Sequence, residues 1–150
     1  MDTKDILKKI REDNDLTQEQ FAQRVLVTRQ AVSRWEMGET QPNNETLKIL
    51  SREFNVSINT LLGSPRKLFC QCCGMPLNED ENISREVDGY FNEDYCKWCY
   101  SDGKFIYTTK DELLDFLMDH MPNPEDLDDK ARRDQYDGWL SQLSHWKARG

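Results

Sequence analysis

Apolar residues recur at intervals of three and four over the first 62 residues, in five short stretches. This spacing is typical of amphipathic helices that bury one face. Each stretch begins at or just after a residue whose side chain can cap a helix, and Gln20 follows one of them at the spacing of a capping box. The pattern therefore predicts five short helices and no strand; the expected caps are Thr3, Thr17, Thr28, Asn43 and Ser57.

The pattern changes after residue 63. Residues 64–67 read SPRK, where Ser-Pro disfavours helix and the apolar periodicity stops. Beyond them, weak strand character at 83–87 and 90–91 flanks Asp88-Gly89, which is a hairpin signal. We therefore expect a helical domain at residues 1–63, a linker at 64–67 and a second domain at 68–150.

The end of the chain is again helical in pattern. Thr109 and Glu112 have capping-box spacing ahead of a leucine-rich stretch, and Asn123-Pro124-Glu125 predicts the start of one last helix. That helix would carry an apolar stripe, here called the aromatic stripe. Its members are Tyr136, Trp139, Leu140, Leu143 and Trp146.

Composition narrows the class of protein. With 150 residues, 32% charged and 37% hydrophobic, the chain has the balance of a folded, soluble protein of one domain or two small ones. It has no apolar run long enough to cross a bilayer, and its first residues lack the apolar stretch of a secretory signal. We therefore expect a cytoplasmic protein that does not enter the membrane.

Charge argues against general binding to nucleic acid or to anionic membranes. The formal net charge is −8, and it is uneven: residues 1–63 hold 9 Lys and Arg against 10 Asp and Glu, whereas residues 64–150 hold 11 against 18. Nonspecific binding to phosphate depends on a surplus of Lys and Arg. The net charge does not exclude a local basic face.

The first chemical motif lies at residues 16–38, LTQEQFAQRVLVTRQAVSRWEMG. Two short capped helices around a turn of about four residues form the corner whose second helix can enter a major groove. Residues 1–62 resemble the Cro/C1-type repressors, the XRE family of bacterial and phage regulators, above all in TRQAVSRWEMGETQP. The resemblance implies a five-helix DNA-binding domain with a recognition helix at about 28–36.

Particular residue roles follow from that resemblance. It implies that Arg29, Gln30 and Ser33 face base edges, and that Gln18, Thr28 and Arg34 hold phosphates. The chemistry agrees, because Arg can pair with guanine and Gln with adenine. One residue departs from the family: Leu26 stands where a small or polar turn residue is usual, and a positive φ there would cost about 1 kcal/mol.

The second motif is a pair of Cys-x-x-Cys units, Cys70/Cys73 and Cys96/Cys99, separated by 22 residues. In a reducing compartment such pairs serve metals rather than disulfides, and tetrahedral zinc takes four thiolates readily. Either Cys72 or Cys73 could partner Cys70. We favour Cys73, because a two-residue gap lets backbone amides turn toward the sulfurs and glycine follows at 74.

The second part of the chain resembles the zinc ribbon family found behind bacterial regulatory domains, through CQCCGMPL, NEDYCKWCY and SDGKF. This resemblance covers about residues 68–147, helical tail included. It implies one structural zinc per chain, although iron could bind the same ligands. Four thiolates leave the metal no open position for substrate, so catalysis at the metal is not expected.

The expected fold is thus mainly α: a five-helix helix-turn-helix domain, then a small β zinc ribbon with a helical tail. The expected function is that of a sequence-specific DNA-binding transcriptional regulator. The alternative is a protein-binding adaptor or antitoxin-like module. An enzyme is not expected, since no nucleophile, base and orienting group appear together. We expect a homodimer, because one such unit reads few base pairs; the aromatic stripe would form the dimer face or cover the ribbon.

Overall fold

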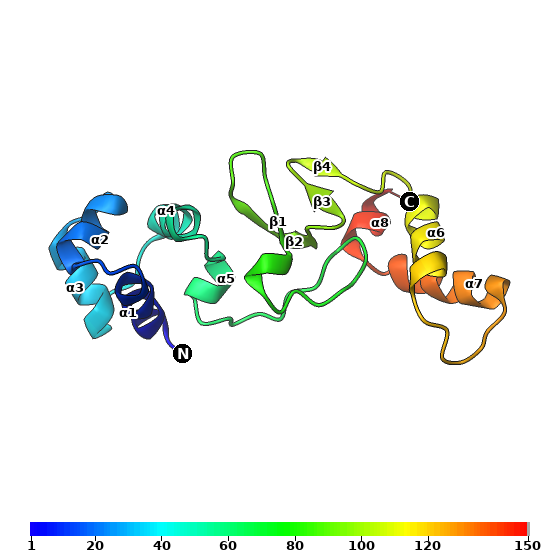
Figure 1. Cartoon of the computed structure of the whole chain (residues 1–150), viewed down its shortest axis with the longest axis horizontal. Helices are drawn as coiled ribbons and strands as arrows, with labels where there is room; N and C mark the ends of the chain where they lie inside the picture. The colour runs from blue at the N-terminus through cyan, green and yellow to red at the C-terminus, as the bar shows by residue number, and fades with distance from the viewer. Residues whose placement is uncertain (150) are drawn as a thin grey trace. The chain divides into compact units, whose positions relative to one another are not determined.

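The computed structural model describes residues 1–149, with the side chain of Arg149 excepted. The chain folds as two compact units (Figure 1). The first comprises Met1–Lys67 together with Gly89–Phe91, and the second comprises Leu68–Asp88 and the described residues from Asn92 onward. No helix among the described residues is long and apolar enough to cross a bilayer.

The first unit contains the five helices that the sequence predicts. Thr17 forms a full capping box with Gln20, and the side chains of Thr28, Asn43 and Ser57 each accept a hydrogen bond from the backbone N–H three residues on. One expected cap is wrong: Asp2 is the capping position and Thr3 is already helical. The helices are α1 Thr3–Asp13, α2 Gln18–Arg24, α3 Arg29–Met37, α4 Asn44–Phe54 and α5 Ile58–Leu61.

One apolar core holds these helices together. Phe21 of α2 is fully buried and stacks on Phe54 of α4, with 4.9 Å between ring centroids. Val32 and Trp35 fix the inner face of α3 in the same core. Each such side chain contributes about 1.5–3 kcal/mol by leaving water. The buried members are Leu7, Phe21, Ala22, Val25, Val32, Trp35, Leu47, Leu50 and Leu61.

The second unit contains two small sheets. β1 Ile83–Arg85 pairs with β2 Phe91–Cys96, on either side of the turn at Asp88-Gly89 that the sequence predicts. β3 Tyr100–Ser101 pairs antiparallel with β4 Lys104–Phe105. Asp102 and Gly103 between them have φ of 50° and 78°, as a tight hairpin requires. The sequence pattern did not predict this second hairpin.

The helical tail differs from its prediction in two ways. Thr109 caps α6 Lys110–His120, but the Glu112 carboxylate accepts from Thr108 rather than closing a capping box. The single last helix from Asn123 is wrong: α7 spans Asp129–Leu140 and α8 Ser144–Arg149. The side chain of Asn123 bonds both backbone groups of Leu127, which stabilises a loop, and Asp128 caps α7 instead.

Part of the aromatic stripe covers the ribbon within one chain. The indole N–H of Trp146 donates to the carbonyl of Cys72 over 2.7 Å, and the Trp146 side chain is 4% exposed. His145 packs on Phe105, with 4.5 Å between ring centroids. Leu140 is fully buried, whereas Trp139 stays 42% exposed. The stripe is therefore not one continuous outer face, and Trp146 and Leu140 do not offer a free surface to a second copy.

Candidate nucleic-acid interface and metal centre

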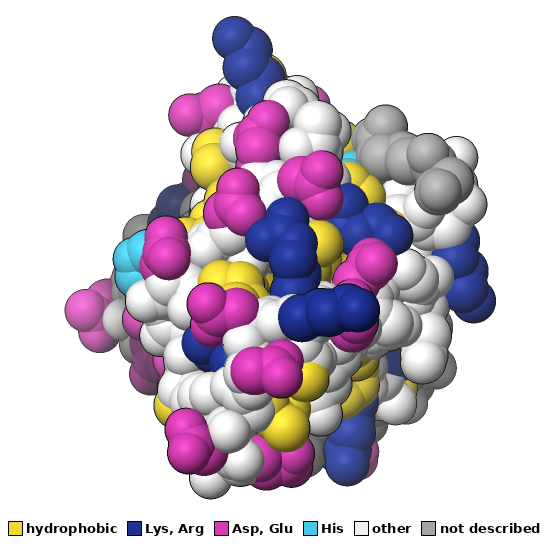
Figure 2. All heavy atoms as spheres, turned by 90° about the vertical axis from the view of Figure 1, so that its right-hand side faces the viewer, with side chains coloured by type: hydrophobic (Ala, Val, Ile, Leu, Met, Phe, Trp, Pro, Cys, Tyr) yellow, Lys and Arg dark blue, Asp and Glu magenta, His cyan; other side chains and the backbone are white. Residues whose placement is uncertain are grey.

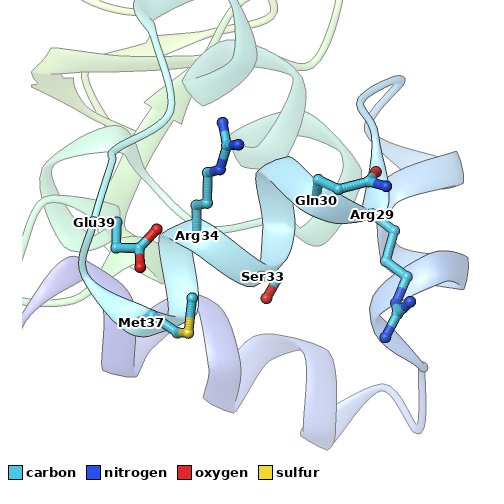
Figure 3. A pocket seen from close by; sticks show the side chains of 6 residues that line it. All are labelled: Arg29, Gln30, Ser33, Arg34, Met37 and Glu39. Carbon is cyan, nitrogen blue, oxygen red and sulfur yellow. The ribbon is translucent and has the colours of Figure 1, made fainter.

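The outer face of α3 carries the polar side chains singled out in the sequence. Val32 and Trp35, 1% and 5% exposed, turn one side of the helix into the core. Helical spacing then places residues 29, 30, 33, 34 and 37 on the opposite side. These side chains and Glu39, from the loop after the helix, line a shallow hollow of ≈250 Å³ (Figure 3). Its lining residues are Arg29, Gln30, Ser33, Arg34, Met37 and Glu39.

Four of the six expected DNA-contacting residues thus lie together around this hollow: Arg29, Gln30, Ser33 and Arg34. The other two stand at helix N-termini with their side chains already bonded. The hydroxyl of Thr28 accepts from the Ala31 N–H at 3.1 Å, and the amide of Gln18 donates to Glu36 at 3.3 Å. Met37 and Glu39 were not anticipated, although Met37 follows from the same helical spacing.

An ion pair fixes α3 against α1. The Arg11 guanidinium donates to both carboxylate oxygens of Glu36, with its Nε 3.0 Å from Oε2 and its Nη2 2.9 Å from Oε1. Their side chains are 16% and 7% exposed. Hydrogen bonding to Glu36 raises the pKa of Arg11, so the guanidinium stays protonated. No local sequence pattern indicates this pair, because Arg11 and Glu36 lie 25 residues apart.

The turn before α3 contains the departure noted in the sequence. Leu26 has φ of 61° and its side chain is 80% exposed. A leucine at positive φ costs about 1–2 kcal/mol, and little burial offsets this cost here. Leu26 thus has the positive φ under which the sequence predicts a cost.

Replacing this leucine by glycine should stabilise the first unit. For Leu26→Gly we expect a net gain of about 0.5–1 kcal/mol, because relief of the strained φ exceeds the entropy that glycine adds to the unfolded chain. Urea unfolding monitored by amide exchange of α2 and α3 measures it. Leu62→Gly is the matched control: Leu62 is also exposed but has φ of −86°, so glycine should destabilise there. A loss of stability in both variants would contradict the strain argument.

The metal centre is formed by two short turns of the second unit. One sulfur atom from each of Cys70, Cys73, Cys96 and Cys99 lies within 4.8 Å of the other three. The Cys73 and Cys96 Sγ atoms are 3.8 Å apart. Tetrahedral zinc with Zn–S bonds of about 2.3 Å needs sulfurs about 3.8 Å apart, so these thiols fit the ion.

Local backbone geometry explains why these thiols converge. The N–H groups of Cys72 and Cys73 each point at the Cys70 Sγ, at 3.4 Å, as expected for a turn that wraps a metal-bound sulfur. Gly74 follows with φ of 80°, a conformation that favours glycine. Cys72 is buried but lies outside the group of four, and its carbonyl binds Trp146.

Crowding makes the four thiols depend on a cation. Hydrogen bonds from the side chain of Cys73, then from Cys96 and Cys99, hold the pKa of Cys70 below its ordinary value. The same sharing with Cys70 raises the pKa of Cys99. Four thiolates so close together repel one another unless a metal ion neutralises them. The site therefore suits a bound divalent metal that leaves no thiol free for other chemistry.

Two family models match the chain. The one described as "Putative zinc ribbon domain" matches residues 69–147, more than half of the chain, and the one described as "Helix-turn-helix" matches residues 7–61. The first region contains the four sulfurs of the metal centre, and the second contains α3 with its outer face.

Three curated relatives share the N-terminal part. HTH-type transcriptional activator BcrR of Enterococcus faecalis is 44% identical over 62 residues, 41% of this chain and 30% of that protein. Antitoxin PezA of Streptococcus pneumoniae is 36% identical over 62 residues, 41% of this chain and 39% of that protein. The chain thus spans less than half the length of these two. Uncharacterized HTH-type transcriptional regulator YqaE of Bacillus subtilis is 34% identical over 85 residues, 55% of this chain and 73% of that protein.

Among solved structures, a match is found with the crystal structure of the P22 c2 repressor protein in complex with synthetic operator 9T. The sequence identity is 31%, the match covers 41% of this chain and 94% of that chain, and the TM-score is 0.40.

These findings confirm the expected fold and cofactor. The zinc ribbon model and the geometry of the four sulfurs agree on one metal ion per chain, which is zinc. The helices before it match the helix-turn-helix model, and the YqaE match covers more than two thirds of that regulator. The chain therefore belongs to the zinc ribbon family and, through its N-terminal helix-turn-helix domain, to the HTH-type transcriptional regulators.

Proposed function

We propose that the protein is a sequence-specific DNA-binding transcriptional regulator that places α3 in the major groove. The observation that carries the proposal is the outer face of α3, where Arg29 and Gln30 are exposed on the first turn of a helix that the core holds by Val32 and Trp35. Such a helix presents its N-terminal side chains to base edges. The relatives named as transcriptional regulators support the same function.

The residues divide into two roles. Arg29 suits the two acceptors of guanine, Gln30 suits adenine, and Ser33 reaches the same groove one turn later. Arg34 suits a phosphate on one side of the helix. Gln18 and Thr28 stand at the N-termini of α2 and α3, where backbone N–H groups attract phosphate, so these two contribute through position more than through their already bonded side chains.

Removing a base-reading side chain should change specificity rather than folding. For Arg29→Ala and for Gln30→Ala we expect a loss of about 1–3 kcal/mol of discrimination at one base position. The measurement is a binding profile over all single-base variants of a site selected from random DNA. Arg24→Ala is the control for loss of a positive charge, because Arg24 pairs with Glu53 and does not line the hollow. An unchanged profile in both variants would contradict this placement of α3.

We further propose that the regulator works as a homodimer. Residues 1–63 hold 9 Lys and Arg against 10 Asp and Glu, so a single unit offers few phosphate contacts. Two units related by a two-fold axis would read half-sites about 34 Å apart, one turn of DNA. Sedimentation equilibrium of the zinc-loaded chain should give twice its 17.7 kDa mass. A chain that stays monomeric at concentrations where it fills its site would contradict the dimer.

The PezA match favours one alternative, an antitoxin-like module whose helical unit contacts a partner protein. Salt dependence separates the two functions. A regulator loses affinity for its site steeply as salt rises, whereas a module that binds protein shows neither discrete sites on genomic DNA nor this slope.

Three further assignments belong to the same proposal. The chain divides into residues 1–63, a linker at 64–67 and residues 68–150; it acts in the cytoplasm, where bacterial DNA lies; and it is not an enzyme. The relatives named as regulators support the cytoplasmic location and the absence of enzymatic activity. The four thiolates also argue against catalysis at the metal, because they leave it no open position.

A further inference from the structure

The second unit contains a cavity that neither the zinc site nor the DNA-binding proposal uses. It has a volume of ≈480 Å³ and lies between the ribbon and the helices α6 and α7. This volume falls in the range of small-molecule sites, about 300–1,000 Å³. Residues from both Cys-x-x-Cys turns and both helices line it, so the cavity depends on the folded second unit.

Five aromatic rings line its wall. Trp98 and Trp139 are 52% and 42% exposed, so the cavity opens to solvent on their side. None of the described lining residues has a side-chain carboxylate, ammonium or guanidinium group. Figure 2 shows one face of the molecule, on which small groups of hydrophobic side chains are exposed among interspersed Lys, Arg, Asp and Glu side chains. The five rings of the wall are Trp98, Tyr107, Phe116, Tyr136 and Trp139.

The metal centre forms the floor of this cavity. Cys73, Cys96 and Cys99 line it, and Cys73 is the least buried of the four ligands. Four thiolates around one Zn²⁺ leave two net negative charges at the floor. The surrounding sequence adds to this field, because residues 64–150 hold 18 Asp and Glu against 11 Lys and Arg. The charge at the floor therefore favours a cation over an anion.

Aromatic walls act in the same direction, because the face of each ring is electron-rich. Two of the five rings already attract cations of the protein. The Lys97 Nζ lies 4.8 Å from the centroid of the Trp98 ring, and the Arg132 Cζ lies 5.7 Å from that of Tyr136. A primary ammonium pays heavily to lose its water in an apolar cavity. A cation whose charge is covered by carbon pays far less.

We propose that this cavity binds one hydrophobic organic cation, a quaternary ammonium or phosphonium that carries aromatic groups. The rings supply cation–π attraction and apolar contact, and the zinc tetrathiolate supplies the opposite charge. Such a molecule would be an effector of the regulator, and this role rests on the proposed function. Binding itself does not depend on DNA and is measured without it.

The test uses two probes of the same size and shape and of opposite charge, tetraphenylphosphonium and tetraphenylborate. Each is titrated by calorimetry into the zinc-loaded full-length chain. We expect one phosphonium per chain and affinity at least about ten-fold above that of the borate. Equal affinity for both ions would mean that the cavity binds apolar groups without regard to charge, which contradicts the proposal. Failure to bind the phosphonium below about 1 mM would also overturn it.

Variants locate the site. Trp98→Ala should weaken phosphonium binding at least about five-fold, and Trp98→Phe should restore most of it, since a ring is retained. Ile106→Ala is the matched control, because Ile106 is as exposed as Trp98 at 52% but does not line the cavity. Zinc content is measured for each variant, so that loss of the metal is not mistaken for loss of the wall. Unchanged affinity in Trp98→Ala would place the probe elsewhere. A failure of these outcomes with intact DNA binding would leave the proposed function standing.

Discussion

Replacing Cys73 or Cys96 by serine is expected to release zinc and to unfold the ribbon. Structural zinc sites of this kind contribute about 10–16 kcal/mol of apparent binding free energy to folding. The strands of the ribbon add little stability of their own, because they run for two to six residues and each sheet has two strands. Such sheets are marginal by themselves. Elemental analysis of the purified variants and the dispersion of their amide NMR signals measure the two effects.

The fifth cysteine provides the control for this prediction. Cys72 is as buried as Cys70 and Cys96, so Cys72→Ser perturbs a similar environment without removing one of the four converging sulfurs. It should retain one zinc per chain and the fold. Signals of α1–α5 should persist in every variant, because that unit has its own core. A Cys72→Ser protein without metal, beside a Cys73→Ser protein that keeps it, would reverse the ligand assignment.

The first unit could be predicted from the sequence because its signals are local. A cap such as Thr17 and its partner Gln20 are three residues apart, and the apolar spacing of each helix lies within one stretch. The outer face of α3 followed from the same helical spacing. Where the sequence misplaced Thr3, the error was one position, within the usual uncertainty of helix ends.

The helical tail depends on contacts between distant segments, and here the prediction of one last helix was wrong. The aromatic stripe assumed one helix, but Asn123 stabilises a loop and the chain turns again between α7 and α8. Trp146 finds its partner, the Cys72 carbonyl, 74 residues away. The aromatic cavity is likewise assembled from both cysteine turns and two helices. Periodicity within one stretch carries no information about such pairings.

The second large effect is expected at the ion pair between α1 and α3. For Glu36→Gln we expect a loss of about 2–4 kcal/mol in the free energy of unfolding of the first unit. The Glu36 side chain is 7% exposed, so its removal as an anion leaves the Arg11 guanidinium largely desolvated without its charge partner. Gln18 loses the same acceptor charge. Urea unfolding followed by hydrogen exchange of the α3 amides measures this loss.

An exposed ion pair in the same unit serves as the control. Arg24 and Glu53 are each 40% exposed, and the Arg24 Nη2 and Nε donate to the Glu53 Oε1 at 2.9 and 3.0 Å; at this exposure Glu53→Gln should cost less than about 1 kcal/mol. The double variant Arg11→Met, Glu36→Leu should be more stable than Glu36→Gln, because replacing both charges by apolar groups leaves no buried charge unpaired.

Because Glu36 lies on α3 itself, Glu36→Gln should also weaken DNA binding without changing the base profile. Equal losses in Glu36→Gln and Glu53→Gln would mean that burial adds nothing to the pair, and that the apolar core alone orients α3.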